Sequence, residues 1–439
     1  MTLWSKDPSS SSLTQQYTEE GKELEQKLLP YDILGNLAHV KMLEKQGYLE
    51  KQELREIEKA LKQIYEEEPE VDAEDVHTFI EEKVTEKTKA DRSVNEADAS
   101  QISHGKAAGK KIHTGRSRNG QVALDTHLYM KEASIEIVEK GLELVGVLES
   151  FSEEKNILIP GYTHQQQAMP SSTGLWASSF ADALVDDLKM LKSAYQVFDQ
   201  SPLGAAAGYG TSLDIDREFT AELLGFRSVQ QNAIYAVNRG KHELMLVQAL
   251  NQVMLDIGKL SEDIINFSED QEIFDIPDEF TTGSSIMPQK QNPDILEIAR
   301  GKSEEMNAHQ QSIYGIISKL TSGYNRDTQL TKKHLFEAVE IVIETLEILT
   351  ELVSGLETVE NFELKDEVFA AYTANQKVEG GVPFREAHHE VKEKQDYVKN
   401  QEVKKPAMQG YSQLEEFWQQ EKEDFRGVKM SLLGNSFEA

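Results

Sequence analysis

Residues 283–290 combine small hydroxyl side chains with a lysine. Ser284 and Ser285 follow a glycine, and Lys290 comes five residues after Ser285. The glycine and proline in this stretch are typical of irregular structure, so we predict an exposed loop. A hydroxyl can remove a proton if its alkoxide is stabilised, and a lysine can balance the charge of a carboxylate. The competing interpretation is a simple connection between two helices.

A helix is predicted to begin directly after this loop. Asn292 is a favourable N-cap, Pro293 suits the first helical position, and Glu297 falls in the first turn. A helix N-terminus presents unpaired backbone N–H groups and a partial positive charge. The loop and the helix end together are therefore suited to binding a carboxylate or to stabilising developing negative charge.

Two further segments carry side chains suited to chemistry. Ser117, Arg118 and Asn119 are adjacent, and the planar fork of arginine suits bidentate recognition of a carboxylate. A solvated basic turn that includes Arg116 is the alternative. His164 is predicted to lie at the start of a long helix, and histidine suits proton transfer near neutral pH. A lone histidine at such a position is more often structural.

The loop at residues 283–294 resembles the signature loop of the fumarase/aspartase superfamily. Members of that superfamily cleave C–N or C–O bonds by β-elimination and release fumarate. Within it, the chain resembles the argininosuccinate lyase family through four more segments, at residues 113–119, 160–164, 324–329 and 381–388. The segments occur in the family's order, and the resemblance extends from residue 3 to about residue 395.

The resemblance implies roles for particular side chains. Four would be catalytic: Ser284 as general base, Lys290 facing the substrate carboxylate, and His164 oriented by Glu297. Ten others would contact substrate, namely Ser117, Arg118, Asn119, Thr163, Ser285, Asn292, Tyr324, Arg326, Gln329 and Lys332. Asp75 and His77 match a further family motif without an assigned role.

The chain also departs from the family pattern. Gly120 stands where the family normally has aspartate, and the loss of that carboxylate could loosen the turn that aims Asn119. Gln167 and Gln291 are departures beside the principal positions. The segment around Gly21 and Glu25 differs too much for substrate residues to be assigned there.

The leading hypothesis is a lyase that converts argininosuccinate to L-arginine and fumarate, the last step of arginine biosynthesis. One alternative is elimination from adenylosuccinate, aspartate or malate. Residues 113–119 and 324–329 favour argininosuccinate because they lie outside the loop shared by the superfamily. Another alternative is a weakly active or non-catalytic structural homologue, which Gly120 keeps open.

Long helices must position these residues. Apolar residues recur at three- and four-residue steps in four segments, and a fifth helix follows Pro293; the four are 135–148, 176–195, 247–264 and 335–353. Helices of this length bury their apolar stripes against one another, so a bundle is expected. We predict an all-α fold with a central long-helix bundle at residues 113–357 between smaller helical domains at 1–112 and 358–439. The polar stretch 88–108 is expected to be an inserted, exposed loop.

Composition limits the partners and the cellular compartment. The chain has 439 residues, a formal net charge of −31 and no cysteine, so nucleic acid and anionic membranes are not expected partners. We find no signal peptide and no apolar run near the ~20 residues of a membrane span, so a soluble cytoplasmic protein is expected. No metal-ligand spacing and no phosphate loop was found, and we expect neither a metal nor a cofactor. The resemblance implies a homotetramer whose active sites are each built from three subunits and take a small-molecule substrate.

Overall fold

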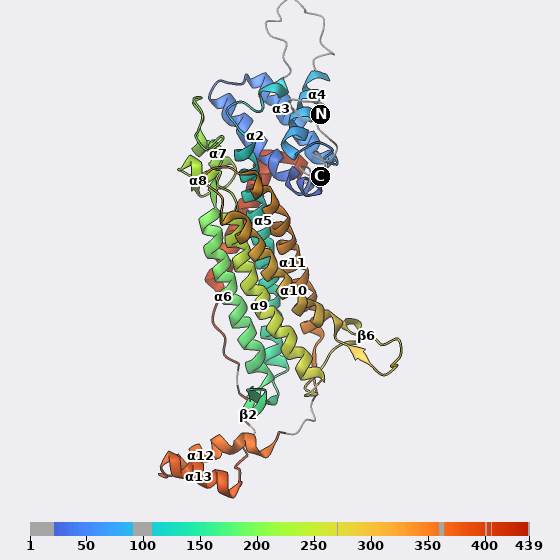
Figure 1. Ribbon diagram of the computed structural model, residues 1–439, viewed down its shortest axis with the longest axis vertical. Coiled ribbons are helices and arrows are strands. Elements are labelled where there is room, and N and C mark those ends of the chain that lie inside the picture. Colours follow the sequence, from blue (N-terminus) through green and yellow to red (C-terminus); the bar gives the residue numbers. More distant parts are fainter. Residues whose placement is uncertain are drawn as a thin grey trace, which may run out of the picture.

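The computed structural model describes residues 22–90, 108–269, 271–359, 364–399, 402–404 and 406–437. Its centre is an elongated bundle of five long helices that run along one axis (Figure 1). They are α5 (Arg118–Glu154), α6 (Thr173–Phe198), α9 (Lys241–Glu269), α10 (Asp294–Ile317) and α11 (Thr331–Gly355). Each contains one of the five predicted segments, and the all-α prediction is confirmed.

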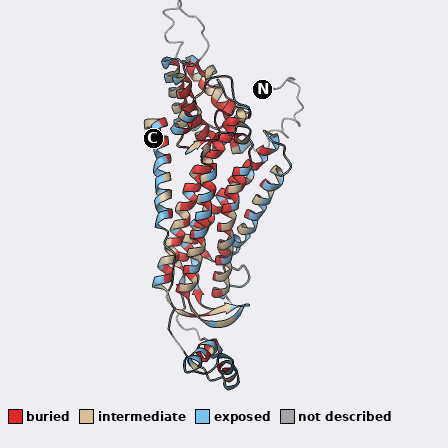
Figure 2. Cartoon of the chain, turned by 90° about the vertical axis from the view of Figure 1, so that its left-hand side faces the viewer, coloured by how far each residue is buried: buried red, intermediate tan, exposed pale blue. Residues whose placement is uncertain are grey.

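The apolar stripes of these helices form the core. Leu128 on α5, Leu188 on α6 and Leu250 on α9 are fully buried, and Figure 2 shows the buried faces turned toward one another inside the bundle. In the bundle, α5 and α6 each begin directly after a serine whose side chain caps the helix. The Ser117 hydroxyl accepts a hydrogen bond from the N–H of Asn119, and the Ser172 hydroxyl accepts one from the N–H of Leu175. None of the described helices is long and apolar enough to cross a membrane.

Shorter helices cover the end of the bundle where α5 begins (Figure 1). These are η1 (Lys22–Leu28), α2 (Leu29–Lys45), α3 (Lys51–Glu67), α4 (Val76–Ala90) and η3 (Ala108–Lys111), with α7 (Arg217–Leu223) and α8 (Ala233–Ala236) nearby. The predicted bounds of the loop at 88–108 are wrong at both ends, because Thr88 belongs to α4 and Ala108 is the first residue of η3. Residues 91–107 lie outside the described part of the chain.

Strands are short. β1 (Leu158–Thr163) and β2 (Gln166–Ser172) form an antiparallel hairpin between α5 and α6, which the sequence analysis did not predict. The other strands are two residues long and pair β3 (Gln200–Ser201) with β4 (Ser228–Val229), β5 (Phe274–Asp275) with β8 (Glu357–Thr358), and β6 (Thr282–Gly283) with β7 (Gln291–Asn292). The remaining 3-10 turns are η4 (Asp278–Phe280), η5 (Arg326–Leu330), η6 (Asp366–Phe369) and η7 (Gly434–Phe437).

The segment after α11 divides into two parts. Helices α12 (Ala370–Glu379) and α13 (Phe384–Lys394) lie beyond the far end of the bundle (Figure 1). Helix α14 (Ser412–Leu433) returns along the bundle, where Trp418 packs edge-on against Tyr195 of α6 with ring centroids 4.9 Å apart. The Tyr195 hydroxyl donates a hydrogen bond to Glu421, at 2.6 Å. The proposed three-domain division of the chain remains a prediction.

Candidate active site

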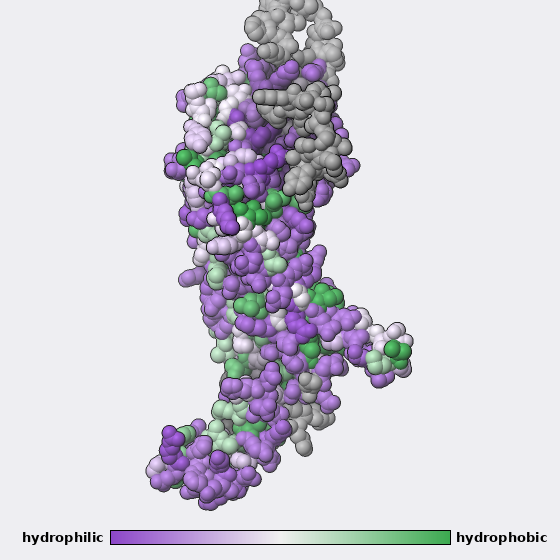
Figure 3. All heavy atoms as spheres, in the orientation of Figure 1, coloured by the Kyte–Doolittle hydropathy of each residue, from purple (hydrophilic) through white to green (hydrophobic). Residues whose placement is uncertain are grey.

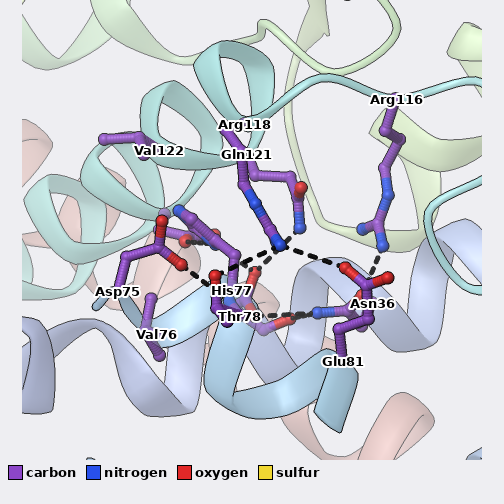
Figure 4. A network of polar contacts seen from close by, with 12 residues as sticks. Asn36, Asp75, Val76, His77, Thr78, Glu81, Arg116, Arg118, Gln121 and Val122 are labelled. Atoms are coloured by element: carbon purple, nitrogen blue, oxygen red, sulfur yellow. Dashed lines mark hydrogen bonds and ion pairs between the residues drawn. The ribbon is translucent and has the colours of Figure 1, made fainter. Parts of the chain in front are cut away.

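The two arginines at the start of α5 are held by the helices that cover it. The guanidinium of Arg118 donates to Glu81 at 3.0 Å and to Thr78 at 3.3 Å, both on α4 (Figure 4). The guanidinium of Arg116 donates to Asn36 of α2 and to the carbonyl of Ile112, both at 2.6 Å. Burial lowers the pKa of Arg116 to about 10. Arg116 is therefore a fixed internal cation, and the alternative of a solvated basic turn is wrong for it.

Two buried carboxyl groups flank His77 beside these arginines. The Nδ1 atom of His77 lies 2.9 Å from Oδ1 of Asp32 and 3.5 Å from Oδ2 of Asp125. All three residues are buried: His77 lies on α4, Asp32 on α2 and Asp125 on α5. We call Asp32, His77, Arg116, Arg118 and Asp125 the arginine–carboxylate cluster. It gathers positive and negative groups in one desolvated region at the start of α5.

The environment drives the pKa values of the two carboxyl groups apart. Burial raises the pKa of Asp125 well above its usual value, and the neighbouring Asp32 raises it further. Burial alone would also raise the pKa of Asp32, but His77, Arg116 and Arg118 outweigh it and lower that pKa. The two shifts have opposite directions: the surroundings favour the ionised form of Asp32 and the protonated form of Asp125. Such a divergence between adjacent carboxyl groups is common at functional sites.

A sequence signal for part of this cluster exists and was missed. Asp32, Asn36 and His39 recur at i, i+4 and i+7 on a helix that is otherwise largely apolar, and all three are buried. This spacing places them on one face. The partner Asp125, on α5, could not be assigned to the same site because its neighbourhood is created by tertiary packing. Asp75 and His77, by contrast, were noticed through their motif.

Lys332 lies buried at the start of α11 and forms an ion pair with Glu25 of η1. The other oxygen of Glu25 accepts a hydrogen bond from the N–H of Val76, at 3.4 Å, next to His77 in the chain. The predicted substrate contact Lys332 is therefore charge-compensated within its own chain. Glu25, for which the sequence analysis assigned no role, is its partner.

The segment before α11 brings two other predicted substrate contacts together. Gln329 donates a hydrogen bond from Nε2 to the hydroxyl of Tyr324, at 3.2 Å, which fixes the two side chains relative to each other. Arg326 is exposed at the start of η5. The end of α10 and the start of α11 frame this segment.

The loop at residues 284–290 projects sideways from the bundle as the tip of the β6–β7 hairpin (Figure 1). The Ser284 hydroxyl accepts hydrogen bonds from the backbone N–H groups of Met287, at 3.1 Å, and Ile286, at 3.4 Å. Ser285 and Lys290 are exposed, as is Ile286 at 83%. Figure 3 shows hydrophobic side chains at the tip of this projection. The predicted exposed loop is confirmed.

The start of α10 differs from the prediction in its capping. Asn292 is the last residue of β7, and Pro293 takes the N-cap position without a side-chain capping bond. The prediction that Asn292 caps the helix is wrong, because pairing of β7 with β6 holds Asn292 in extended backbone. This leaves the Asn292 side chain for other contacts. Glu297 is exposed in the first turn of α10, as expected.

His164 occupies the turn of the β1–β2 hairpin and not a helix start. His164 and Gln165 have φ values of 52° and 60°, which suit a two-residue hairpin turn with both central residues left-handed. Helix α6 begins nine residues later, at Thr173. Thr163 is the last residue of β1, and both Thr163 and His164 are exposed. The prediction that His164 begins a helix is wrong, although its proposed chemistry is unaffected.

The predicted site residues therefore fall into groups that one chain keeps apart. Ser117 and His164 lie beyond opposite ends of α5, whose 37 residues span about 55 Å. The loop at 284–290 and the segment around Tyr324 flank opposite ends of α10, whose 24 residues span about 36 Å. Among the described residues, no hydrogen bond or ion pair joins His164 to Glu297. The pairing implied by the resemblance stays a prediction.

Comparison with known proteins identifies the family. A lyase family model matches residues 6–306. Argininosuccinate lyase from Parabacteroides distasonis is 38% identical over 382 residues, covering 84% of this chain and 82% of that protein. Argininosuccinate lyase from Thermotoga neapolitana is 36% identical over 407 residues, covering 89% of this chain and 98% of that protein.

The solved structures agree in fold. A variant of EDDS lyase with bound fumarate superposes with a TM-score of 0.75 at 18% identity, over 98% of this chain and 95% of that chain. Identity this low supports the fold alone, whereas the two curated relatives match most of the sequence. This chain belongs to the argininosuccinate lyase family.

Proposed function

We propose that this protein is a carbon–nitrogen lyase that cleaves argininosuccinate to L-arginine and fumarate. The observation that carries this proposal is the extended sequence similarity to argininosuccinate lyases. The range matched by the lyase family model, residues 6–306, contains both the loop at 284–290 and the start of α5. The reaction would place the protein at the last step of arginine biosynthesis. Cytoplasmic localisation is part of the same proposal.

Ser284 is the proposed general base, and its surroundings support that role. Removing a proton from carbon requires the serine alkoxide to be stabilised. Two backbone N–H groups, from Ile286 and Met287, already point at the Ser284 oxygen. The positive charge of Lys290 and the N-terminus of α10 add to the stabilisation of negative charge in this loop. Lys290 would also face the substrate carboxylate that gains charge during the elimination.

The elimination breaks one C–N bond and one C–H bond. In our proposal Ser284 takes the proton from the carbon next to a carboxylate, and the electron pair of that bond forms the double bond of fumarate. The C–N electron pair leaves with the guanidino nitrogen of arginine, which takes a proton from His164. Glu297 would orient the His164 ring and support its charged form.

Substrate binding would use the start of α5 and the segment before α11. Arg118 is held by Glu81 and Thr78, and Ser117 and Asn119 flank it in the chain. These side chains, with Thr163, Ser285 and Asn292, are proposed to bind the carboxylates and amide-like groups of the substrate. Tyr324, Arg326, Gln329 and Lys332 are proposed to contact its arginine half or its carboxylates.

We further propose that these groups meet in a homotetramer, with three chains contributing to each site. The lengths of α5 and α10 support this, because they hold the groups tens of ångströms apart within one chain. Exposed apolar side chains on the loop and on α10 also support an interface there. They include Ile286 and, on α10, Ile298 and Tyr314 with 60% and 57% of their surface exposed.

The test is fumarate release, followed by ultraviolet absorbance, with argininosuccinate offered beside adenylosuccinate, aspartate and malate. We expect turnover of argininosuccinate alone. Turnover of a different substrate would overturn the specificity and keep the elimination chemistry. No turnover of any substrate would favour the second candidate, a non-catalytic homologue, which the glycine at position 120 favours. In that case the Gly120→Asp variant would show whether the missing carboxylate is the cause.

A further inference from the structure

Two histidines and a glutamate converge between α10 and α11, outside the candidate active site. The Nδ1 atoms of His309 on α10 and His334 on α11 lie 3.1 Å apart. Oε2 of Glu337, one turn after His334, lies 3.6 Å from Nδ1 of His309. The three ligand atoms all lie within 4.8 Å of one another. We call these residues the His–His–Glu cluster.

These separations match the edges of a metal coordination shell. Nitrogen ligands lie about 2.0–2.1 Å from zinc, so two ligands of a tetrahedral site are roughly 3.3 Å apart. The observed separations of 3.1 and 3.6 Å fall on either side of that value. Two imidazoles and one carboxylate, with the remaining position open to water, form a known ligand set for zinc and related divalent transition metals. Calcium and magnesium favour all-oxygen ligands instead.

Hydrogen bonding alone does not account for the position of Glu337. One histidine can donate from Nδ1 to the other, which explains the 3.1 Å separation. The 3.6 Å between Glu337 and His309 is too long for a hydrogen bond. The carboxylate therefore approaches the pair without bonding to His309, in the place where a third metal ligand would lie.

The cluster is both protected and reachable. His309 is buried, with 7% of its surface exposed, and its Nε2 has no hydrogen-bond partner among the described residues. Its polar contacts are therefore made through Nδ1, toward the cluster. The Glu337 side chain is 38% exposed, which provides an entry path from solvent. Burial lowers the pKa of His334, and His309 lowers it further, which favours the neutral ring that metals bind.

A second group of possible metal ligands consists of Asp32, His77 and Asp125, whose ligand atoms also lie within 4.8 Å of one another. This group is less suited to a metal ion than the His–His–Glu cluster. It is fully buried, and Arg116 and Arg118 lie close enough to lower the pKa of Asp32. Those positive charges oppose a bound dication. Among the described residues, no arginine forms an ion pair or hydrogen bond with the His–His–Glu cluster, and the exposed Lys333 lies 4.0 Å from the other oxygen of Glu337.

We propose that His309, His334 and Glu337 bind a divalent transition metal ion of the zinc type. The expectation from sequence that the chain has no metal site rested on local spacing. That approach misses this cluster because His309 and His334 are 25 residues apart and meet only through packing of two helices. A bound ion would tie α10, which begins beside the loop at 284–290, to α11, whose second residue is Lys332. Metal binding should therefore stabilise this helix pair.

The experiment uses the full chain, stripped with a chelator and then dialysed. Isothermal titration with Zn²⁺ is expected to give one site per chain, and Co²⁺ should give visible d–d absorption typical of histidine ligation. His334→Gln and Glu337→Gln should each weaken Zn²⁺ binding by at least about 10-fold, in line with the loss of a ligand. Zn²⁺ should raise the melting temperature of the wild-type chain and not that of His334→Gln.

The matched control is His389→Gln. His389 and Glu393 form an exposed pair on α13 with 3.5 Å between Nδ1 and Oε1, so they represent adventitious surface binding. Zn²⁺ binding that survives in His334→Gln and Glu337→Gln, or that is lost in His389→Gln, would overturn the proposal. So would the absence of Zn²⁺ binding by the wild-type chain. Circular dichroism of the metal-free variants checks that they fold, and none of these readouts depends on lyase activity.

Discussion

Ser117 and Lys155 cap the two ends of the same helix, α5, and its 37 residues hold them about 55 Å apart. Asn119 lies in the first turn of this helix, and His164 follows its far end at the tip of the β1–β2 hairpin. If both act on one substrate molecule, they must come from different chains. This geometry makes the sharing of active sites open to a direct test.

The test is co-expression of two inactive chains, Asn119→Ala and His164→Asn. If the chains assort at random, about one quarter of the sites will receive both native side chains, so roughly that fraction of the wild-type activity should return. Each variant alone should stay inactive and folded, since His164 is exposed and the Asn119 contact to Ser117 uses its backbone N–H. Fumarate release by the purified mixture is the measurement.

Its control is a mixture of Ser117→Ala with Asn119→Ala. These residues lie at the same end of α5, so every site contains at least one defect however the chains assort. We expect no return of activity in this mixture. Equal recovery in both mixtures, or none in the first, would contradict sites shared between chains.

Ser284→Ala should lower kcat for argininosuccinate by at least about 100-fold, the usual contribution of a general base. The fold should be unaffected because the Ser284 hydroxyl bonds only to its own loop among the described residues. Thr281→Ala removes a hydroxyl near the base of the same hairpin, where it bonds to the carbonyl of Asp278, and should leave kcat near the wild-type value. Comparable activity in Ser284→Ala would remove serine from the mechanism.

Gly120→Ala should increase the free energy of unfolding by about 0.5–1 kcal/mol, because glycine is a poor helix former. Position 120 lies in the first turn of α5, and an added Cβ would be 3.5 Å from the carbonyl oxygen of Ala206, an ordinary contact. Gly141, in the same helix, gives the contrast, since its Cβ would lie only 3.0 Å from Leu188. Denaturant unfolding of both variants measures the difference. A loss of stability in Gly120→Ala would show that this turn requires glycine.

Asp187 on α6 predicts a pH dependence of stability. Burial, followed by the facing Asp256 on α9, raises its pKa to about 7 in the folded chain. The unfolded value is about 3.9, so the stability that the protonated carboxyl contributes is complete below that pH and is lost as the pH rises through 7. Asp187→Asn should remove this loss and raise the unfolding free energy at pH 8 by at least about 1 kcal/mol.

The comparison needs melting curves at pH 5 and pH 8 for the wild type, Asp187→Asn and the exposed control Asp214→Asn. We expect the gain from Asp187→Asn at pH 8 to shrink at pH 5, while Asp214→Asn changes little at either pH. A gain of equal size at both pH values would rule out titration of Asp187 as the cause. One oxygen of Asp187 has no hydrogen-bond partner among the described residues, which fits a carboxyl that is costly to ionise.

The long helices could be predicted because their signal is local. Stripes such as Leu335, Val342 and Leu349 repeat at helical steps, and burial of one face is all that the pattern requires. The β1–β2 hairpin was missed because its segment carries no alternation of apolar and polar residues, and its turn uses His164 and Gln165 where glycine or asparagine would have given a signal.

The candidate site was only partly predictable, for a different reason. Motifs identified Arg118, Ser284 and His164, since these lie in segments with a recognisable order of residues. Asp125 was not singled out and Glu25 was given no role, because the importance of each depends on a partner on another element: His77 for Asp125 and Lys332 for Glu25. In the proposed tetramer, the way the separate groups combine would depend on contacts between chains, which a single sequence does not reveal.

The return of α14 along the bundle has a consequence for synthesis. The bundle helices leave the ribosome first, yet Tyr195 of α6 receives Trp418 and Glu421 only when α14 has emerged. The ion pairs of Lys422 with Glu139 and of Lys429 with Glu132 join α14 to α5 at the same late stage. The aromatic side chain of Tyr195 thus stays without its α14 partners from its own synthesis until that of residues 412–433. During that interval the growing polypeptide is the form of this molecule that most needs a chaperone.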